Sequence, residues 1–125
     1  MKILIIEDEE ILAKTIKEKL LAEGFDVFVA TDGLEGVKMA LSVKPDLILL
    51  DLLLPKLDGL SVLRRIRNDS WGLYANVVVL SNLSNPSDIT KGVNIGLNDI
   101  SQYMVKTDWS LDELIVEIKK RLDID

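Results

Sequence analysis

The sequence predicts one α/β domain, a doubly wound five-stranded parallel sheet with helices on both faces. The chain has 125 residues, the length of one ordinary domain. Short apolar runs alternate along it with segments whose apolar residues recur at helical spacing, and such alternation gives a parallel sheet covered on both sides. No repeat, low-complexity segment or Pro/Gly/Ser-rich linker divides the chain. We therefore expect a single domain over residues 1–125.

The first half of the chain predicts three strands, each followed by a helix. The strands are short continuous apolar runs, typical of buried parallel strands, at 3–6, 27–30 and 47–50. Apolar residues at helical spacing follow at 12–20, 37–41 and 60–66. Gly24 is expected to end the first helix, and Asp32 with Glu35 has the spacing of a pair that starts the second.

The second half predicts two more strands, at 77–80 and 103–105. Pro86 suits the first turn of a helix between them. Ser110 and Glu113 have the spacing of a capping box before a last helix at 111–122. Right-handed crossovers leave few topologies, and for five strands they favour the flavodoxin-like order 2-1-3-4-5.

Composition excludes several kinds of chemistry. The chain has no cysteine and no histidine, which removes disulfides, thiol nucleophiles, imidazole bases and most zinc sites. A net charge of −6 opposes binding of nucleic acid by this domain. No apolar run approaches the roughly 18 residues of a membrane helix, and the N-terminal run meets acid too soon for a secretory signal. We expect no membrane association and a cytoplasmic location.

Polar side chains stand where four of the expected strands end. Glu7 and Asp8 follow the first strand, Asp51 the third, Ser81 the fourth and Lys106 the fifth. The carboxyl ends of parallel strands share one edge of the sheet, where ligands bind. Three carboxylates at that edge repel one another, and Mg²⁺ prefers such oxygen ligands. The sequence therefore predicts a magnesium site there, unless Glu7 and Asp8 only cap the first helix.

Asp51 lies inside a long apolar segment, residues 47–54. Burying an unpaired carboxylate costs on the order of several kcal/mol, so a partner is expected. A carboxylate beside a cation can act as a nucleophile and form an aspartyl phosphate, to which Ser81 and Lys106 would donate. The simpler alternatives are an acid bound by backbone amides, a turn serine and a solvated lysine.

The chain resembles a response regulator receiver domain, the phosphoacceptor module of two-component signalling, of the chemotaxis-regulator type. Four segments distributed along the whole chain carry the resemblance: 5–9 (IIEDE), 49–59 (LLDLLLPKLDG), 78–81 (VVLS) and 103–106 (YMVK). The Asp-x-x-x-Pro-x-x-Asp-Gly pattern is specific by itself. Its combination with an acidic pair, a serine and a lysine at strand ends is more specific still.

The resemblance implies how the acceptor and its metal are bound. Asp51 would take a phosphoryl group from a histidine kinase or a phosphotransfer protein. Asp8 and Asp51 would bind Mg²⁺, joined by Glu7 directly or through water and by the backbone carbonyl of Leu53. Enzyme activity would be limited to self-phosphorylation from a phosphodonor and slow self-dephosphorylation.

The resemblance also implies a switch. Ser81 would bond a phosphoryl oxygen, Lys106 would pair with Asp51 or its phosphate, and Tyr103 would swing inward as Ser81 moves. The face made by the fourth helix, fifth strand and fifth helix would then control a downstream protein or a missing effector domain. The sequence leaves open whether phosphorylation also joins two copies of the domain through that face.

Four residues depart from the family pattern or flank its site. Asn82 stands where a smaller residue is usual, and Leu53 and Leu83 flank the site where polar residues can position water. A long-lived phosphoryl state is therefore expected. Thr107 replaces the usual proline after Lys106, and because a cis bond costs about 3–4 kcal/mol without proline we expect a trans bond.

Three other functions fit these residues less well than the switch. A phosphate-independent interaction module on the same fold would not need Asp8, Asp51, Ser81 and Lys106 together. A nucleotide or flavin binder would need a phosphate-cradling loop after the first strand, where residues 7–10 are acidic instead. An aspartate-nucleophile phosphatase would carry a second acid two residues after Asp51, where the chain has leucine.

Overall fold

Five parallel strands form one sheet in the order β2-β1-β3-β4-β5 in the computed structural model of the chain, which describes residues 1–81, 102–105 and 109–124. The strands are β1 (Lys2–Ile6), β2 (Asp26–Ala30), β3 (Leu47–Asp51), β4 (Asn76–Ser81) and β5 (Gln102–Val105). The helices are α1 (Glu10–Ala22), α2 (Gly33–Val43), α3 (Gly59–Arg67) and α5 (Leu111–Arg121), with a short 3-10 turn η1 (Gly72–Tyr74). The predicted fold class and strand order are confirmed. The helix expected to start near Pro86 lies outside the described residues.

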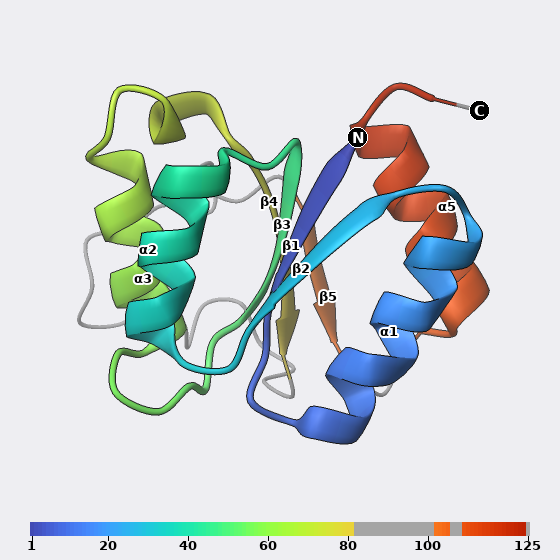
Figure 1. Cartoon of the computed structure of the whole chain (residues 1–125), viewed down its shortest axis with the longest axis horizontal. Coiled ribbons are helices and arrows are strands. Elements are labelled where there is room, and N and C mark those ends of the chain that lie inside the picture. Colours follow the sequence, from blue (N-terminus) through green and yellow to red (C-terminus); the bar gives the residue numbers. More distant parts are fainter. Residues whose placement is uncertain (82–101, 106–108, 125) are drawn as a thin grey trace.

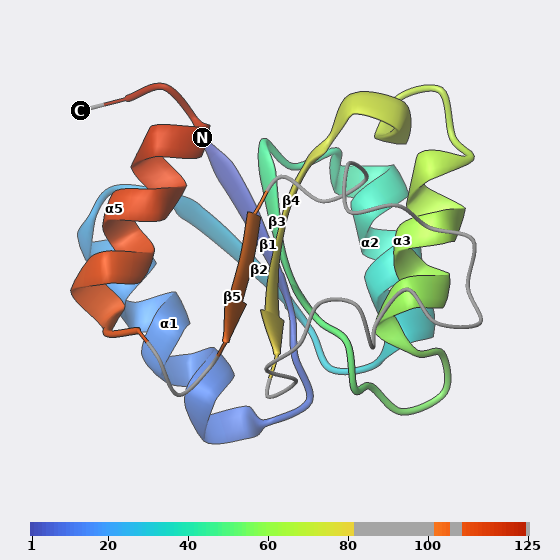
Figure 2. The ribbon, with the colours of Figure 1, turned by 180° about the vertical axis from the view of Figure 1, so that it is seen from behind.

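The helices form one layer on each side of the sheet. In Figure 1, α2 and α3 lie on one side and α1 and α5 on the other, and Figure 2 shows the same layers from behind. Successive strand residues point to opposite faces. Leu4 and Ile6 of β1 accordingly belong to the core under α2 and α3, and Ile3 and Ile5 to the core under α1 and α5.

The ends of the helices agree with the local sequence. Gly24 follows α1 with φ of 93°, a left-handed conformation that glycine adopts without a steric penalty. The Asp32 carboxylate accepts a hydrogen bond from the Glu35 amide at 2.8 Å, and the Ser110 hydroxyl accepts one from the Glu113 amide at 3.2 Å. Both side chains thus satisfy amide groups that a helix start leaves without a partner.

The described helices also bear on the membrane question. Across residues 1–81, 102–105 and 109–124, no helix has the length and apolar character needed to cross a bilayer.

Candidate functional site

The register of the central strands brings two acidic residues together. Ile6 of β1 pairs with Leu50 of β3, so Glu7 and Asp51 follow paired residues at the carboxyl edge of the sheet. That edge is at the bottom of Figure 1, where the arrow of β4 ends. Counting by alternation along each strand, Glu7 and Asp51 belong to the face covered by α1 and α5.

Three carboxylates meet at this edge. Glu7, Asp8 and Asp51 each place a carboxylate oxygen so that all three oxygens lie within 4.8 Å of one another. Glu7 is 4% exposed and Asp51 is 5% exposed, whereas Asp8 is exposed. Glu9 occupies the capping position of α1, so Glu7 and Asp8 precede the cap. Capping of the first helix therefore does not account for the pair.

These donors suit a hard divalent cation. All three are carboxylate oxygens, which Mg²⁺ and Ca²⁺ prefer over nitrogen or sulfur. Two buried carboxylates at this distance repel strongly in a region of low dielectric constant, and a cation between them relieves that repulsion. The exposure of Asp8 leaves one side of the cluster in contact with solvent. We treat the cluster as a candidate metal centre.

The β3–α3 loop, residues 52–58, lies next to Asp51. The Leu53 amide donates to Asp51 Oδ1 at 3.3 Å, which partly satisfies the buried carboxylate and orients it. The loop ends where the Gly59 amide donates to the Leu52 carbonyl at 2.9 Å. A Cβ on Gly59 would overlap the Asp51 carbonyl oxygen, so the start of α3 approaches the end of β3 more closely than a side chain permits.

Asp58 caps α3 at the end of this loop. Its carboxylate accepts from the Ser61 amide at 3.0 Å and from the Ser61 hydroxyl at 2.9 Å. Partial burial opposes ionisation, but these hydrogen bonds outweigh it and hold the pKa of Asp58 below its ordinary value of 3.8. Asp58 was not among the expected site residues, although the Asp-x-x-Ser spacing before an apolar helix is a recognisable capping signal.

The other expected site residues are placed only in part. Ser81 ends β4 directly after Leu80, the residue that pairs with Asp51, so its backbone is at the same edge. Tyr103 lies in β5 and pairs with Val79. Lys106 lies outside the described residues, as do Asn82, Leu83 and Thr107 with its peptide bond. The roles expected of all of these residues stay predictions.

The tip of the β3–α3 loop makes contacts with α2 that the sequence does not predict. Lys56 has a positive φ of 67°, and its ammonium lies 3.5 Å from a carboxylate oxygen of Asp32. Gly33, the first residue of α2, donates its amide to the Pro55 carbonyl at 3.2 Å. Asp32 with Glu35 predicted a helix start, but nothing in the sequence indicated which loop that helix start would contact.

Comparison with known proteins gives a consistent result. The family model described as the response regulator receiver domain matches residues 3–119. The transcriptional regulatory protein DltR of Streptococcus agalactiae is 37% identical over 121 residues, which cover 97% of this chain and 51% of that protein. The chain therefore spans about half the length of the curated relatives that it matches.

Solved structures show the same fold. The receiver domain of a Francisella response regulator superposes with a TM-score of 0.83 at 30% identity, covering 98% of this chain and 96% of that one. The receiver domain of a sensor histidine kinase from Pseudomonas aeruginosa, with a magnesium ion coordinated in its active site cleft, gives 0.85 at 27% identity, covering 98% and 97%.

Proposed function

Because this chain belongs to the response regulator receiver domain family, whose members are phosphoryl-accepting switches of two-component signalling, we propose that Asp51 is its phosphoryl acceptor. One observation carries the proposal: Asp51 is 5% exposed at the end of β3 and shares a 4.8 Å cluster with Glu7 and Asp8. A carboxylate kept at that position is available for nucleophilic attack at the carboxyl edge of the sheet.

The chemistry assigned to Asp51 is a single displacement. A carboxylate oxygen attacks the phosphorus of a phosphohistidine, the P–N bond breaks, and its electron pair returns to the imidazole of the donor protein. Asp51 then carries an acyl phosphate. The Leu53 amide, 3.3 Å from Oδ1, keeps the carboxylate in one orientation during this attack.

We assign the cluster to Mg²⁺. Asp8 and Asp51 would hold the ion together with the Leu53 carbonyl, and Glu7 would bind it directly or through water. When bound, Mg²⁺ reduces the repulsion between these carboxylates and an incoming phosphoryl group. The magnesium-bound receiver domain from Pseudomonas aeruginosa supports this assignment at the level of the family.

The switch that follows is assigned to the second half of the chain. Ser81 would bond the phosphoryl group, Lys106 would pair with it, and Tyr103 would turn inward. The face built from the fourth helix, β5 and α5 would then signal to a partner, and phosphorylation could join two copies through it. We propose that residues 1–125 form one cytoplasmic receiver domain, phosphorylated by a histidine kinase or phosphotransfer protein.

The output of the domain is also a proposal. DltR is a transcriptional regulator of which this chain spans 51%, so an effector domain outside the present sequence is consistent with the comparison. A separate downstream protein is the other target. The charge of −6 makes nucleic acid an unsuitable ligand for the receiver domain alone.

The direct test is the intact mass after incubation with acetyl phosphate and Mg²⁺. We expect a gain of one phosphoryl group that is lost in Asp51→Asn and in the absence of Mg²⁺. Slow decay of the phosphoryl group over minutes would fit the environment expected from Asn82 and Leu83, whereas decay within seconds would contradict it. No mass gain, with no response to beryllium fluoride either, would favour the phosphate-independent interaction module.

A further inference from the structure

The start of α2 lies directly against the tip of the β3–α3 loop. The Gly33 amide donates to the Pro55 carbonyl at 3.2 Å, and Lys56 Nζ lies 3.5 Å from Asp32 Oδ2. A Cβ on Gly33 would overlap the Leu57 carbonyl oxygen. The two segments are therefore in backbone contact, with an ion pair beside it.

The tip of the loop has a conformation that needs such support. Lys56 has φ of 67°, in the left-handed region that favours glycine. The Leu57 amide donates to the Pro55 carbonyl at 2.7 Å and closes a three-residue turn around Lys56. Turns of this kind are rare and strained, and they persist only where neighbouring contacts hold them.

Asp32 is suited to provide that support. Its side chain is 13% exposed, whereas that of Lys56 is 64% exposed, so solvent screens the pair mainly from the lysine side. The hydrogen bond from the Glu35 amide, and then the charge of Lys56, keep the pKa of Asp32 below its ordinary value of 3.8 despite some desolvation. Asp32 is therefore ionised at neutral pH.

The tip is connected to the acceptor carboxylate through Leu53. Two hydrogen bonds hold the ends of the loop. The Gly59 amide donates to the Leu52 carbonyl at 2.9 Å, and the Leu53 amide donates to the side-chain Oδ1 of Asp51 at 3.3 Å. Leu52, Leu54 and Leu57 pack against the core under α2 and α3, and the tip also contacts the start of α2. A shift of the tip is expected to tilt Leu53, whose amide orients Asp51.

We propose that Asp32 and Lys56 are positioning residues for phosphoryl transfer, because their ion pair holds the β3–α3 loop in the conformation that directs the Leu53 amide at Asp51. The inference rests on the proposed role of Asp51. It adds a pair of residues that touch neither the carboxylate cluster nor the reacting atoms.

Substitutions at Lys56 test the charge separately from the backbone. Lys56→Met removes the charge at similar length, and Lys56→Arg keeps it. As a control, Lys38→Met removes an exposed charge on α2 that lies outside this ion pair. With acetyl phosphate and Mg²⁺, we expect Lys56→Met to slow the initial mass gain about three- to tenfold, less than the roughly hundredfold cost of a 1 Å misplacement. Lys56→Arg and Lys38→Met should stay within about twofold of the parent rate, a change too small to indicate misplacement.

A second readout does not require phosphorylation. In metal-free protein, the amide resonance of Leu53 should shift in Lys56→Met and keep its position in Lys56→Arg, while the thermal midpoint stays the same in both. A slower rate with an unshifted Leu53 amide would overturn the inference. If the parent protein accepts no phosphoryl group, the proposed function fails, and the Leu53 amide still decides whether the ion pair positions the loop.

A double variant tests whether the two residues act as a pair. Asp32→Asn removes the charge but keeps a side chain that caps helices well. We expect Asp32→Asn/Lys56→Met to be no slower than the slower single variant, because each substitution breaks the same contact. Multiplied losses in the double variant would show independent effects and contradict the proposal.

Discussion

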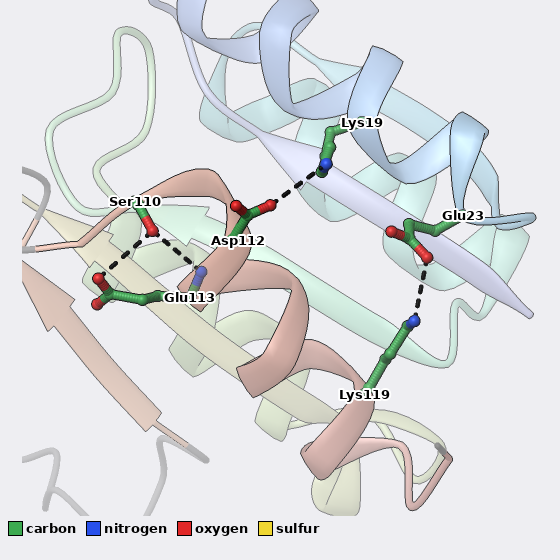
Figure 3. A network of polar contacts seen from close by, with 6 residues as sticks. All are labelled: Lys19, Glu23, Ser110, Asp112, Glu113 and Lys119. Atoms are coloured by element: carbon green, nitrogen blue, oxygen red, sulfur yellow. Dashed lines mark hydrogen bonds and ion pairs between the residues drawn. The ribbon is translucent and has the colours of Figure 1, made fainter.

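The two helix layers differ in the contacts that hold them in place. On the α2–α3 side, glycines let backbones approach closely: Cβ atoms on Gly33 and Gly59 would overlap carbonyl oxygens, and one on Gly36 would lie 2.8 Å from Ile6 Cγ2. On the α1–α5 side, side chains join the helices through Lys19–Asp112 at 3.3 Å and Lys119–Glu23 at 3.0 Å. Figure 3 shows that these ion pairs bridge the two helices.

The α2–α3 layer is therefore the fixed layer, and the α1–α5 layer is the adjustable one. Backbone contacts at glycine positions leave no room for a methyl group, so α2 and the β3–α3 loop have one arrangement. Long charged side chains can re-form contacts after small shifts, and exposed ion pairs contribute little free energy. The loop that follows Asp51 thus contacts the fixed layer, while the Asp51 side chain lies on the face covered by α1 and α5.

The largest losses in the free energy of unfolding are expected from truncating core residues, and they should be equal on the two sides of the sheet. Ile66 of α3 and Ile118 of α5 are both 0% exposed, so truncation of either to alanine should lower the free energy of unfolding by about 2–5 kcal/mol. Urea unfolding of both variants measures this. If only the Ile66 variant is destabilised, the α1–α5 layer tolerates the loss of a core side chain as well, and the two layers differ more than we infer.

Small-to-large substitution should distinguish the layers. Gly36→Ala adds a methyl group against Ile6 and should cost about 1–3 kcal/mol, although alanine favours a helix interior by about 1 kcal/mol over glycine. Lys38→Ala, at an exposed position of the same helix, should change stability by about 0.5 kcal/mol or less. Stabilisation by Gly36→Ala would mean that the α2–α3 layer adjusts after all.

Loss of an ion pair in the α1–α5 layer should lower the free energy of unfolding by less. Lys119 and Glu23 are 28% and 32% exposed, so Glu23→Gln should cost about 0.2–1 kcal/mol. The loss should shrink at 1 M salt, where the Debye length is about 3 Å. Denaturant unfolding at low and high salt measures both values, and Lys38→Ala again provides an exposed control. A loss that does not respond to salt would indicate a packing effect.

The smallest effect concerns pH at the end of the loop. The pKa of Asp58 is lowered in the folded protein, so its carboxylate stabilises the fold above its ordinary pKa of 3.8. That contribution is lost as pH falls through the lowered folded value. Asp58→Asn keeps a capping side chain but does not titrate. The stability difference between parent and variant should therefore narrow below pH 4, and a widening difference would contradict this sign.

Local pattern was sufficient to predict most of the fold. Apolar runs located the strands, and the end of β3 placed Asp51 at the carboxyl edge because parallel strands share that edge. The same argument predicted that Glu7 and Asp8 would join it, as their 4.8 Å cluster shows. The burial of Glu7 could not be predicted, because residues 7–10 form one acidic run in which nothing distinguishes Glu7 from its neighbours.

The contact between α2 and the loop could not be predicted in this way. Lys56 has no sequence feature that indicates a left-handed backbone, because its φ depends on contacts made more than twenty residues away in the chain. Gly33 likewise reads as an ordinary first residue of a helix. Its close approach to Leu57 becomes evident only when β2 and β3 lie on either side of β1.

The pairing of Lys119 with Glu23 joins residues 96 positions apart, and it has a consequence for biosynthesis. During translation, the apolar side of α1 and the adjoining side of the sheet leave the ribosome long before Leu114, Ile115 and Ile118 can cover them. The opposite side can be covered much earlier, because α2 and α3 immediately follow their strands. We therefore expect nascent chains to expose one unfinished apolar surface, where chaperones would bind, until α5 emerges.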